Sequence, residues 1–522
     1  MKNIKILSGF FMAISIIACK DAEDELLDIN NTNEISVELI GTDLAVTEGA
    51  VNAIYAPMQG VGMNGRWGNL LYDAMSDEGN APSDQADIDR ISKYLLDGST
   101  QANEQFFTGC YQGIHRCNTL LDEADKFSFA EDDNNNFLGQ AYFMRAHYYF
   151  LLVTRFNEVP LKINAVDTQV PKSRAIDIYN QIISDLNNAA DLLKEKGAQE
   201  QGRPTNESAY AYLGRVHMFK GDQFGDKEDY QLSLDNLNKV VSYSLVDSYI
   251  DNFHYNGEYN DESLFEIGFV DEAGTSSPDG AWQSGAPAGR GVIEGNFRSA
   301  EYSGWASIKA TKTVFEAFES GDPRQEESFF ENGDEMAGGV VTWGEGEGMT
   351  DDEKKEIEAK IGDGFNGWVN ALPEDQYAVR KYSVYIDRKH QFQSNGINYK
   401  LIRYADVLLL KAEAEMKRDG GDLQTAVGYM NEVRARTSVN MPPYPTPEYP
   451  TGTFEEAFAA LMHERQTELA FEGHRLVDLI RWKKDVETII KVKSNYTAAK
   501  RYLPIPNKEL QTNPNFNNTV GN

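Results

Sequence analysis

Apolar residues spaced three and four positions apart recur along most of this chain, and this spacing most constrains its fold. Between residues 176 and 193 it places isoleucine, tyrosine, leucine and alanine side chains on one face of a helix. The segment Asn103–Lys126 shows the same spacing. The chain is therefore predicted to be mainly α-helical. Further helices are expected at Val46–Met58, Ala141–Phe156, Glu207–Lys220, Tyr230–Tyr243, Tyr404–Lys417, Leu423–Arg436 and Phe454–Trp482.

Several of the expected helices combine small residues with large ones. Ala209, Ala211 and Gly214 share one helix with large aliphatic residues, and Ala412 and Ala414 share another. Small residues let two helices approach closely, and stacked helix pairs bury a continuous core, as in tetratricopeptide repeats. The predicted fold class is all-α, a tetratricopeptide-like helix-pair solenoid packed against an irregular, loop-rich region with few short strands.

The helical pattern is interrupted in the second half of the chain, where glycine is frequent and a strand is expected only at Ser263–Val270. We expect an N-terminal helical part at residues 41–260 and a C-terminal part at residues 261–522. The loop-rich insert at 261–398 belongs to the second part. Long irregular segments on a rigid scaffold often carry binding sites.

The N-terminus has the features of an export signal. A positively charged start precedes the apolar run Ile6–Ala18, which is too short to span a bilayer as a helix, and Cys19 follows directly. The cysteine resembles the lipidation site of a bacterial lipobox, so we expect residues 1–18 to be cleaved and Cys19 to be acylated. An ordinary signal peptide beside a chance cysteine is the alternative. Residues 19–40 are predicted to form a flexible acidic tether.

Charge and cysteine content exclude several classes of protein. The net charge of −33 disfavours nucleic acid and anionic lipid headgroups as partners. Among uncharged and charged glycans, it favours a neutral one, such as a β-glucan or α-glucan, over alginate or a sulfated polymer. Cys110 and Cys117 lie two turns apart on one expected helix, too far apart for a disulfide, and are interpreted as small buried residues.

Taken together, several motifs resemble the SusD/RagB family of outer-membrane nutrient-uptake lipoproteins. The resemblance covers essentially the whole chain. The matching residues are Ser76–Glu78, Arg145-Ala146, Phe156, Val159–Leu161, Ile402–Leu409, Ala412-Glu413, His463–Arg465, Glu468-Leu469, Phe471–Gly473, Arg475, Asp478-Leu479, Arg481-Trp482, Leu503–Pro506 and Asn513-Pro514.

This resemblance implies a helical solenoid at the bacterial cell surface, anchored by lipid in the outer membrane and facing the medium. Family members act as lids on a SusC-like TonB-dependent transporter and deliver captured oligosaccharide or another nutrient to it. The acidic residues after Cys19 resemble a surface-export signal of such lipoproteins.

Tryptophans in glycine-rich segments are the candidates for sugar stacking, because an indole face covers the C–H side of a pyranose ring. Burying such a face is worth roughly 2–3 kcal/mol. Amide, carboxylate and guanidinium groups would bond the hydroxyls. The predicted ligand-binding residues are Trp67, Trp282, Trp305 and Trp343 with Asn64, Arg66, Asn69, Asp77 and Arg290. For each tryptophan, the alternative is a buried anchor under a loop. The GxGxxG sequence at 60–65 follows an expected helix and not a strand, so it does not indicate nucleotide binding.

The C-terminal string contains Glu464, Glu468 and Glu472 at helical spacing, with arginines nearby. We interpret it as a structural charge network that holds the last helix on the repeats, and Trp482 as part of it, in preference to a catalytic site. Position 467 is threonine, so the string contains no HExxH zinc motif. No cofactor is expected. Calcium at the acidic run 131–136 is the alternative to a solvated turn between helices, and Asp84, Asp87 and Asp89 are interpreted likewise.

The favoured function is therefore a non-catalytic, cell-surface glycan-binding lipoprotein that works with an outer-membrane transporter. A surface glycoside hydrolase with paired carboxylates is one alternative, because 82 acidic residues offer many pairs. A solenoid scaffold that binds other proteins is the other.

Overall fold

The computed structural model describes residues 37–81, 86–269, 308–330, 350–352, 355, 377–382 and 397–518, and the backbone alone of 292–293, 335–336, 339–342, 368–370, 376 and 394–395. Long helices dominate these residues, and strands are short, which confirms the predicted fold class. The long helices are α2 (Leu44–Gln59), α5 (Gln101–Asp122), α6 (Glu131–Phe156), α7 (Ala175–Leu192), α8 (Asn206–Phe224), α9 (Lys227–Leu237), α14 (Tyr404–Lys417), α15 (Leu423–Arg434) and α16 (Phe454–Glu468).

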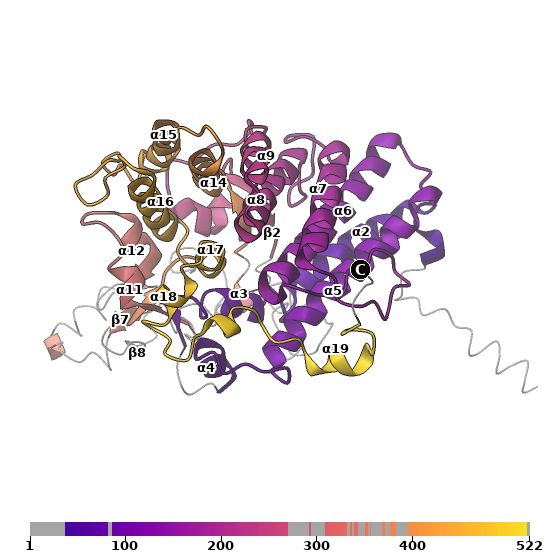
Figure 1. Cartoon of the computed structure of the whole chain (residues 1–522), viewed down its shortest axis with the longest axis horizontal. Coiled ribbons are helices and arrows are strands. Elements are labelled where there is room, and N and C mark those ends of the chain that lie inside the picture. Colours follow the sequence, from indigo (N-terminus) through magenta and orange to yellow (C-terminus); the bar gives the residue numbers. More distant parts are fainter. Residues whose placement is uncertain are drawn as a thin grey trace, which may run out of the picture.

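These helices pack in chain order, each against the next. Helix α5 contacts α6, α6 contacts α7, α7 contacts α8 and α8 contacts α9. Helix α14 then packs on α9 and carries α15 and α16, so the row continues with helices from the far end of the chain (Figure 1). The close α8–α9 approach depends on Gly214, since a β-carbon there would lie 2.4 Å from Leu237.

Several expected helix boundaries were wrong, including the end of Tyr230–Tyr243, because α9 ends at Leu237. The acidic run 131–136 is not a turn between helices, because α6 begins at Glu131 and these residues form its first turns. Acidic side chains at a helix N-terminus are favoured by the helix dipole. The expected helix Phe454–Trp482 is two helices, α16 and α17 (Arg475–Arg481), and the chain between them turns at Phe471 and Gly473, which both have positive φ.

Short helices cover one side of this row. They are α3 (Trp67–Tyr72), α4 (Ala86–Ser92), α11 (Lys312–Phe315), α12 (Arg324–Ser328), α17, α18 (Asp485–Ile489) and α19 (Asn507–Thr512). The described residues also form 3-10 turns at Val37–Leu39, Ala124–Lys126, Ile250–Phe253, Tyr255–Gly257 and Ala498–Lys500. In Figure 1 the short helices α3, α4, α17 and α18 lie below the long ones.

The strands form small sheets that join distant segments. An antiparallel sheet has the order β1 (Gly79–Asn80), β4 (Lys309–Thr311), β9 (Gln376–Val379) and β5 (Phe329–Phe330). Strand β2 (Ser263–Ile267) pairs antiparallel with β11 (Tyr399–Arg403), with Tyr399 opposite Ile267. Strands β3 (Val292–Ile293) and β10 (Ser394–Asn395) also pair, and β7 (Gly339–Thr342) lies between β6 (Glu335–Met336) and β8 (Trp368–Asn370).

The largest hydrophobic core runs from Ile40 to Leu503 and includes residues of α2, α5–α8, β2, β4 and α17. A second core joins α14, α15 and α16. Cys110 and Cys117 are buried and unbonded, as predicted. Ile40 is also buried, so the folded part begins within the predicted tether. Within the described residues, no helix is both long enough and apolar enough to cross a membrane.

Candidate functional site

Trp67 does not present a face to solvent, and its prediction as a sugar platform was wrong. Its side chain is 2% exposed, and its indole Nε1 donates a hydrogen bond to Gln105 Oε1 at 2.7 Å. The turn between α2 and α3 packs directly on α5, since a β-carbon at Gly62 would lie 2.4 Å from the Gln105 carbonyl oxygen. Gly62 therefore serves this packing, whereas Gly65 packs on the backbone of Gln59 and Gly60 within the turn. The indole anchors the turn.

The polar residues predicted beside Trp67 are also buried. The guanidinium carbon of Arg66 lies 4.3 Å from the centroid of the Trp67 ring, and burial lowers the pKa of Arg66 to about 10. Asn69 donates a hydrogen bond to the carbonyl oxygen of Asn64 at 3.0 Å. Asp77 accepts two hydrogen bonds from Arg475, at 2.9 and 3.0 Å. These groups hold the protein together, and their prediction as ligand contacts was wrong.

The other predicted stacking residues, Trp282, Trp305 and Trp343, and their partner Arg290 lie outside the described residues, as does Cys19. Their roles remain predictions.

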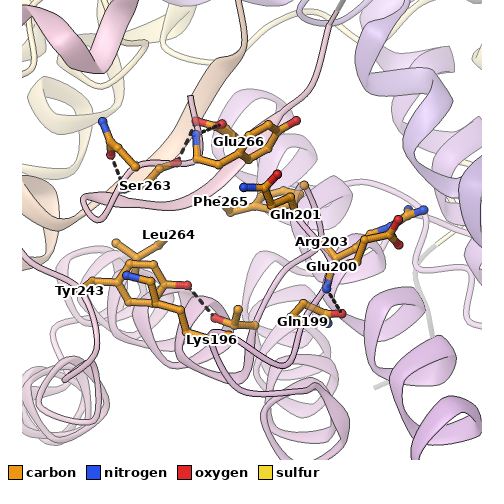
Figure 2. Close-up of a pocket in the computed structure, with 15 residues that line it drawn as sticks. Lys196, Gln199, Glu200, Gln201, Arg203, Tyr243, Ser263, Leu264, Phe265 and Glu266 are labelled. Carbon is orange, nitrogen blue, oxygen red and sulfur yellow. Dashed lines mark hydrogen bonds and ion pairs between the residues drawn. The ribbon is translucent and has the colours of Figure 1, made fainter. Parts of the chain in front are cut away.

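An open pocket lies between the α7–α8 connection and strand β2 (Figure 2). Its volume is about 360 Å³, near the lower end of the roughly 300–1,000 Å³ range of small-molecule pockets. The connection forms one wall, and the segment from Tyr259 through β2 forms the other. We call it the α7–α8 pocket. Its lining residues are Lys196, Gly197, Gln199, Glu200, Gln201, Gly202, Arg203, Thr205, Tyr243, Tyr259, Asn260, Ser263, Leu264, Phe265 and Glu266.

Local sequence explains the floor of the pocket. Thr205 caps α8, because its hydroxyl accepts a hydrogen bond from the Ser208 backbone and the Ser208 hydroxyl accepts one from the Thr205 backbone. The Thr205 hydroxyl is also 3.0 Å from the phenol oxygen of Tyr243, the contact drawn in Figure 2. The Ser208 hydroxyl donates to the carbonyl oxygen of Leu264 at 2.6 Å. One helix cap therefore joins both walls.

The charged groups of the pocket are paired. Lys196 Nζ lies 2.9 Å from Asp261 Oδ1 and 4.2 Å from the centroid of the Tyr243 ring. Arg203 Nε lies 3.6 Å from Glu200 Oε2. Glu266, which is 2% exposed, forms a 2.9 Å ion pair with Lys400 through Oε2.

Glu266 is also held by neutral donors. It accepts hydrogen bonds from the Tyr259 backbone at 2.6 Å, the Ser263 hydroxyl at 2.9 Å and the Asn398 amide at 3.1 Å. Burial raises the pKa of the Tyr243 and Tyr259 phenols, so both are neutral donors at physiological pH. These contacts engage both carboxylate oxygens of Glu266 within the protein. The pocket therefore offers hydrogen bonding and aromatic surface, which suits binding.

The C-terminal glutamates form the predicted structural network, which confirms that interpretation. Glu464, Glu468 and Glu472 are nearly or fully buried. Glu468 accepts from Arg403 at 2.6 Å and from Arg436 at 2.8 Å. Further ion pairs link Glu464 to Arg324 and Arg434, Glu468 to Arg324, Glu262 to Arg403 and Arg436, and Glu472 to Arg403 and Lys381.

Other residues of this string also make structural contacts. Asp478 pairs with Arg481 at 2.8 Å, whereas Arg475 pairs with Asp77 from the other end of the chain. Trp482 is 9% exposed and donates a hydrogen bond to Glu413 at 2.8 Å, as expected of a structural residue. Within the residues described, no group of three histidine, cysteine, aspartate or glutamate side chains could hold a metal ion.

Sequence reasoning missed the α7–α8 pocket. The only local signal is the glycine- and glutamine-rich stretch before α8, with the cap residue Thr205 at its end. That stretch is typical of any connection between helices. Its meeting with Tyr259 and β2 follows from contacts across more than 50 positions, such as the one between Ser208 and Leu264.

Two protein-family models match this chain. The model of the SusD family matches residues 216–521, and a second model, described as starch-binding associating with outer membrane, matches residues 26–218. A SusD-like protein of Formosa agariphila is 24% identical, with 99% of each chain covered.

Solved structures agree with these matches. A SusD superfamily protein from Bacteroides vulgatus is 27% identical, with a TM-score of 0.72 over 91% of this chain and 98% of that one. A laminarin binding SusD-like protein is 24% identical, with a TM-score of 0.71 over 90% of this chain and 98% of that one. Because the family model alone covers more than half of the sequence and the helical row has the same fold, this chain belongs to the SusD family.

Proposed function

We propose that this protein is a cell-surface lipoprotein that captures a glycan and delivers it to a SusC-like TonB-dependent outer-membrane transporter. The single observation that carries the proposal is the family match, which extends over almost the entire chain with relatives of the same length. One matched family is described as starch-binding and associated with the outer membrane. Among structures of the same fold, one is called laminarin binding, and a surface glycan-binding protein from Bacteroides thetaiotaomicron is in complex with laminarihexaose.

The chain's own residues supply the chemistry that this function needs. Trp282, Trp305 and Trp343, with Arg290, are the proposed stacking and hydrogen-bonding groups for an extended glycan. Trp67 is not part of this proposal, because its side chain is buried. Acylation of Cys19 would hold the protein at the outer membrane, where a transporter partner would receive the ligand. Binding without catalysis agrees with the fully engaged state of Glu266 in the α7–α8 pocket.

Affinity electrophoresis against neutral and acidic polysaccharides tests this function. We expect retardation by a neutral glucan and loss of retardation when Trp282, Trp305 and Trp343 are changed to alanine together, with an unchanged helical circular-dichroism spectrum. Trp482→Phe serves as a control indole outside the proposed site. Failure to bind every glycan tested would refute the function, and release of reducing sugar from a bound glycan would favour the hydrolase alternative.

Anchoring and partnership need a separate experiment. Cys19→Ser is expected to move the protein from the outer-membrane fraction to the soluble fraction without changing glycan affinity. A tagged wild-type protein is expected to co-purify with a TonB-dependent transporter from outer membranes. If the serine variant stays in the membrane fraction, the lipid anchor is wrong. If no such transporter co-purifies, the proposed partnership is wrong.

A further inference from the structure

The α7–α8 pocket has the form of a built ligand site and is not simply a gap between loops. One of its walls depends on Tyr259, which is 36% exposed and has a left-handed backbone with φ of 53°. The phenol of Tyr259 lies against two glycines, since a β-carbon at Gly268 would be 2.9 Å from its oxygen and one at Gly202 would be 3.5 Å away. A larger residue at Gly268 would push the ring away. The backbone therefore holds an aromatic side chain at the edge of the cavity.

The charges in the pocket indicate a neutral ligand. Lys196 is neutralised by Asp261, Arg203 by Glu200 and Glu266 by Lys400. An ionic ligand would have to compete with these contacts, whereas a neutral polar one would leave them intact. These pairs leave the pocket with no net charge that an ionic ligand could neutralise.

The remaining surface suits a ligand with hydroxyls around an apolar face. Tyr259 contributes an exposed ring with a neutral phenol, whereas Tyr243 is 6% exposed and only borders the cavity. The described residues give the Gln201 side chain no hydrogen bond, so its exposed amide is available at the rim. In the view of Figure 2, Gln201 overlaps Phe265 and is separated from Tyr243 at the other wall. Planar amides and aromatic rings together recognise the edge and the face of a sugar ring.

We propose that the α7–α8 pocket binds one or two pyranose rings of a neutral saccharide, and so takes a short oligosaccharide or the end of a longer chain. The size limit follows from the volume of about 360 Å³, which leaves no room for an extended polymer. The choice of carbohydrate as the ligand class rests on the proposed function. The tryptophans of that function are not needed for this site, because Tyr259 supplies its exposed ring and Gln201 its amide.

Isothermal titration calorimetry with neutral disaccharides of glucose, galactose and mannose tests the proposal on the full-length purified protein. At least one disaccharide is expected to bind. Tyr259→Asn removes the ring but keeps a residue that tolerates positive φ, and we expect it to raise the dissociation constant roughly 10-fold or more. Gln201→Ala, an exposed change that does not threaten folding, is expected to raise it about 3- to 10-fold.

Matched controls separate the pocket from general effects. Tyr259→Phe keeps the ring and should stay within about 3-fold of wild type, given the modest value of one hydrogen bond. Gln424→Ala changes an exposed glutamine on α15, away from the pocket, and should change nothing. The triple change of Trp282, Trp305 and Trp343 to alanine should abolish retention by polysaccharide but keep one disaccharide site, which the added Tyr259→Asn change should remove.

The outcomes distinguish a failure of the pocket proposal from a failure of the proposed function. If polysaccharides bind but no disaccharide does, or if disaccharide binding survives both Tyr259→Asn and Gln201→Ala, the pocket proposal is refuted and the proposed function stands. Loss of disaccharide binding in the tryptophan variant would also refute it, by showing a single shared site. If no carbohydrate of any length binds, the proposed function itself fails.

Discussion

Replacing Glu468 by glutamine is predicted to destabilise the protein strongly, although it alters one atom of the side chain. The carboxylate is completely buried and accepts hydrogen bonds from Arg403 at 2.6 Å, Arg436 at 2.8 Å and Arg324 at 3.0 Å. These guanidinium groups lower the pKa of Glu468 and outweigh the opposite effect of burial. Glutamine removes the negative charge and turns an N–H₂ group toward at least one arginine.

The magnitude follows from leaving buried cations without a counterion. Breaking a buried ion pair by removing one partner costs about 3–5 kcal/mol. With an unfolding entropy of roughly 2.1 cal/mol/K per residue over about 500 residues, this corresponds to a melting temperature lower by about 3–5 °C if the chain unfolds cooperatively. The network joins α12 to α16 through Arg324, so loss of cooperativity is also expected, with the α12 segment released first.

Differential scanning calorimetry and urea unfolding monitored by circular dichroism measure this change. Glu455→Gln is the matched control, because Glu455 lies on the same helix but is exposed, and its effect should stay below about 1 kcal/mol. Added salt should not reproduce the Glu468→Gln effect in the wild type, since buried pairs are poorly screened. Equal effects of the two glutamine variants would refute the view that this network stabilises the fold.

Three further predictions concern buried residues. Burial raises the pKa of Asp73 to about 7. Between pH 8 and 5 the folded state therefore binds a proton that the unfolded state does not bind. The free energy of unfolding consequently increases as the pH falls over this range. The advantage of wild type over Asp73→Asn in thermal melts should therefore increase by on the order of 2 kcal/mol over this range, and a constant difference would contradict it. Trp67→Ala should cost about 3–5 kcal/mol in urea unfolding yet leave glycan affinity unchanged, whereas selective loss of affinity would restore Trp67 to the binding site. Gly62→Ala places a β-carbon 2.4 Å from a backbone oxygen and should lower stability by about 1–3 kcal/mol, so a variant as stable as wild type in the same melts would show that this turn is not tightly packed.

Local spacing was a reliable guide to the helices. Helix α14 spans the predicted range Tyr404–Lys417, and α5 and α8 lie within a few residues of theirs. Periodicity did not reveal the break after Glu468, because the residues there keep helical spacing while Phe471 and Gly473 adopt positive φ. It likewise missed that the acidic run before Phe137 starts α6, since polar residues suit both a turn and a helix N-terminus.

The candidate site was less predictable than the fold. The sequence of a turn with a tryptophan between glycines does not indicate whether that turn is open to solvent or packed on another helix. The contact with Gln105 in the folded protein shows that Trp67 is buried. The structural role of the C-terminal glutamates was predictable from their density of opposite charges, but their partners Arg324 and Lys381 were not.

By itself, the sequence determined that the chain is helical, that its helices pair through small residues, and that its last charged string is structural. Helical spacing depends on neighbours three or four positions away, and the charged string combines acidic and basic residues within a short stretch, so both can be read from the sequence. The tertiary structure alone decided that Arg475 meets Asp77, that Trp67 lies in the interior, and that the connection before α8 faces Tyr259 across a cavity. Each of these depends on which surfaces meet when distant segments pack, and no local spacing encodes that meeting.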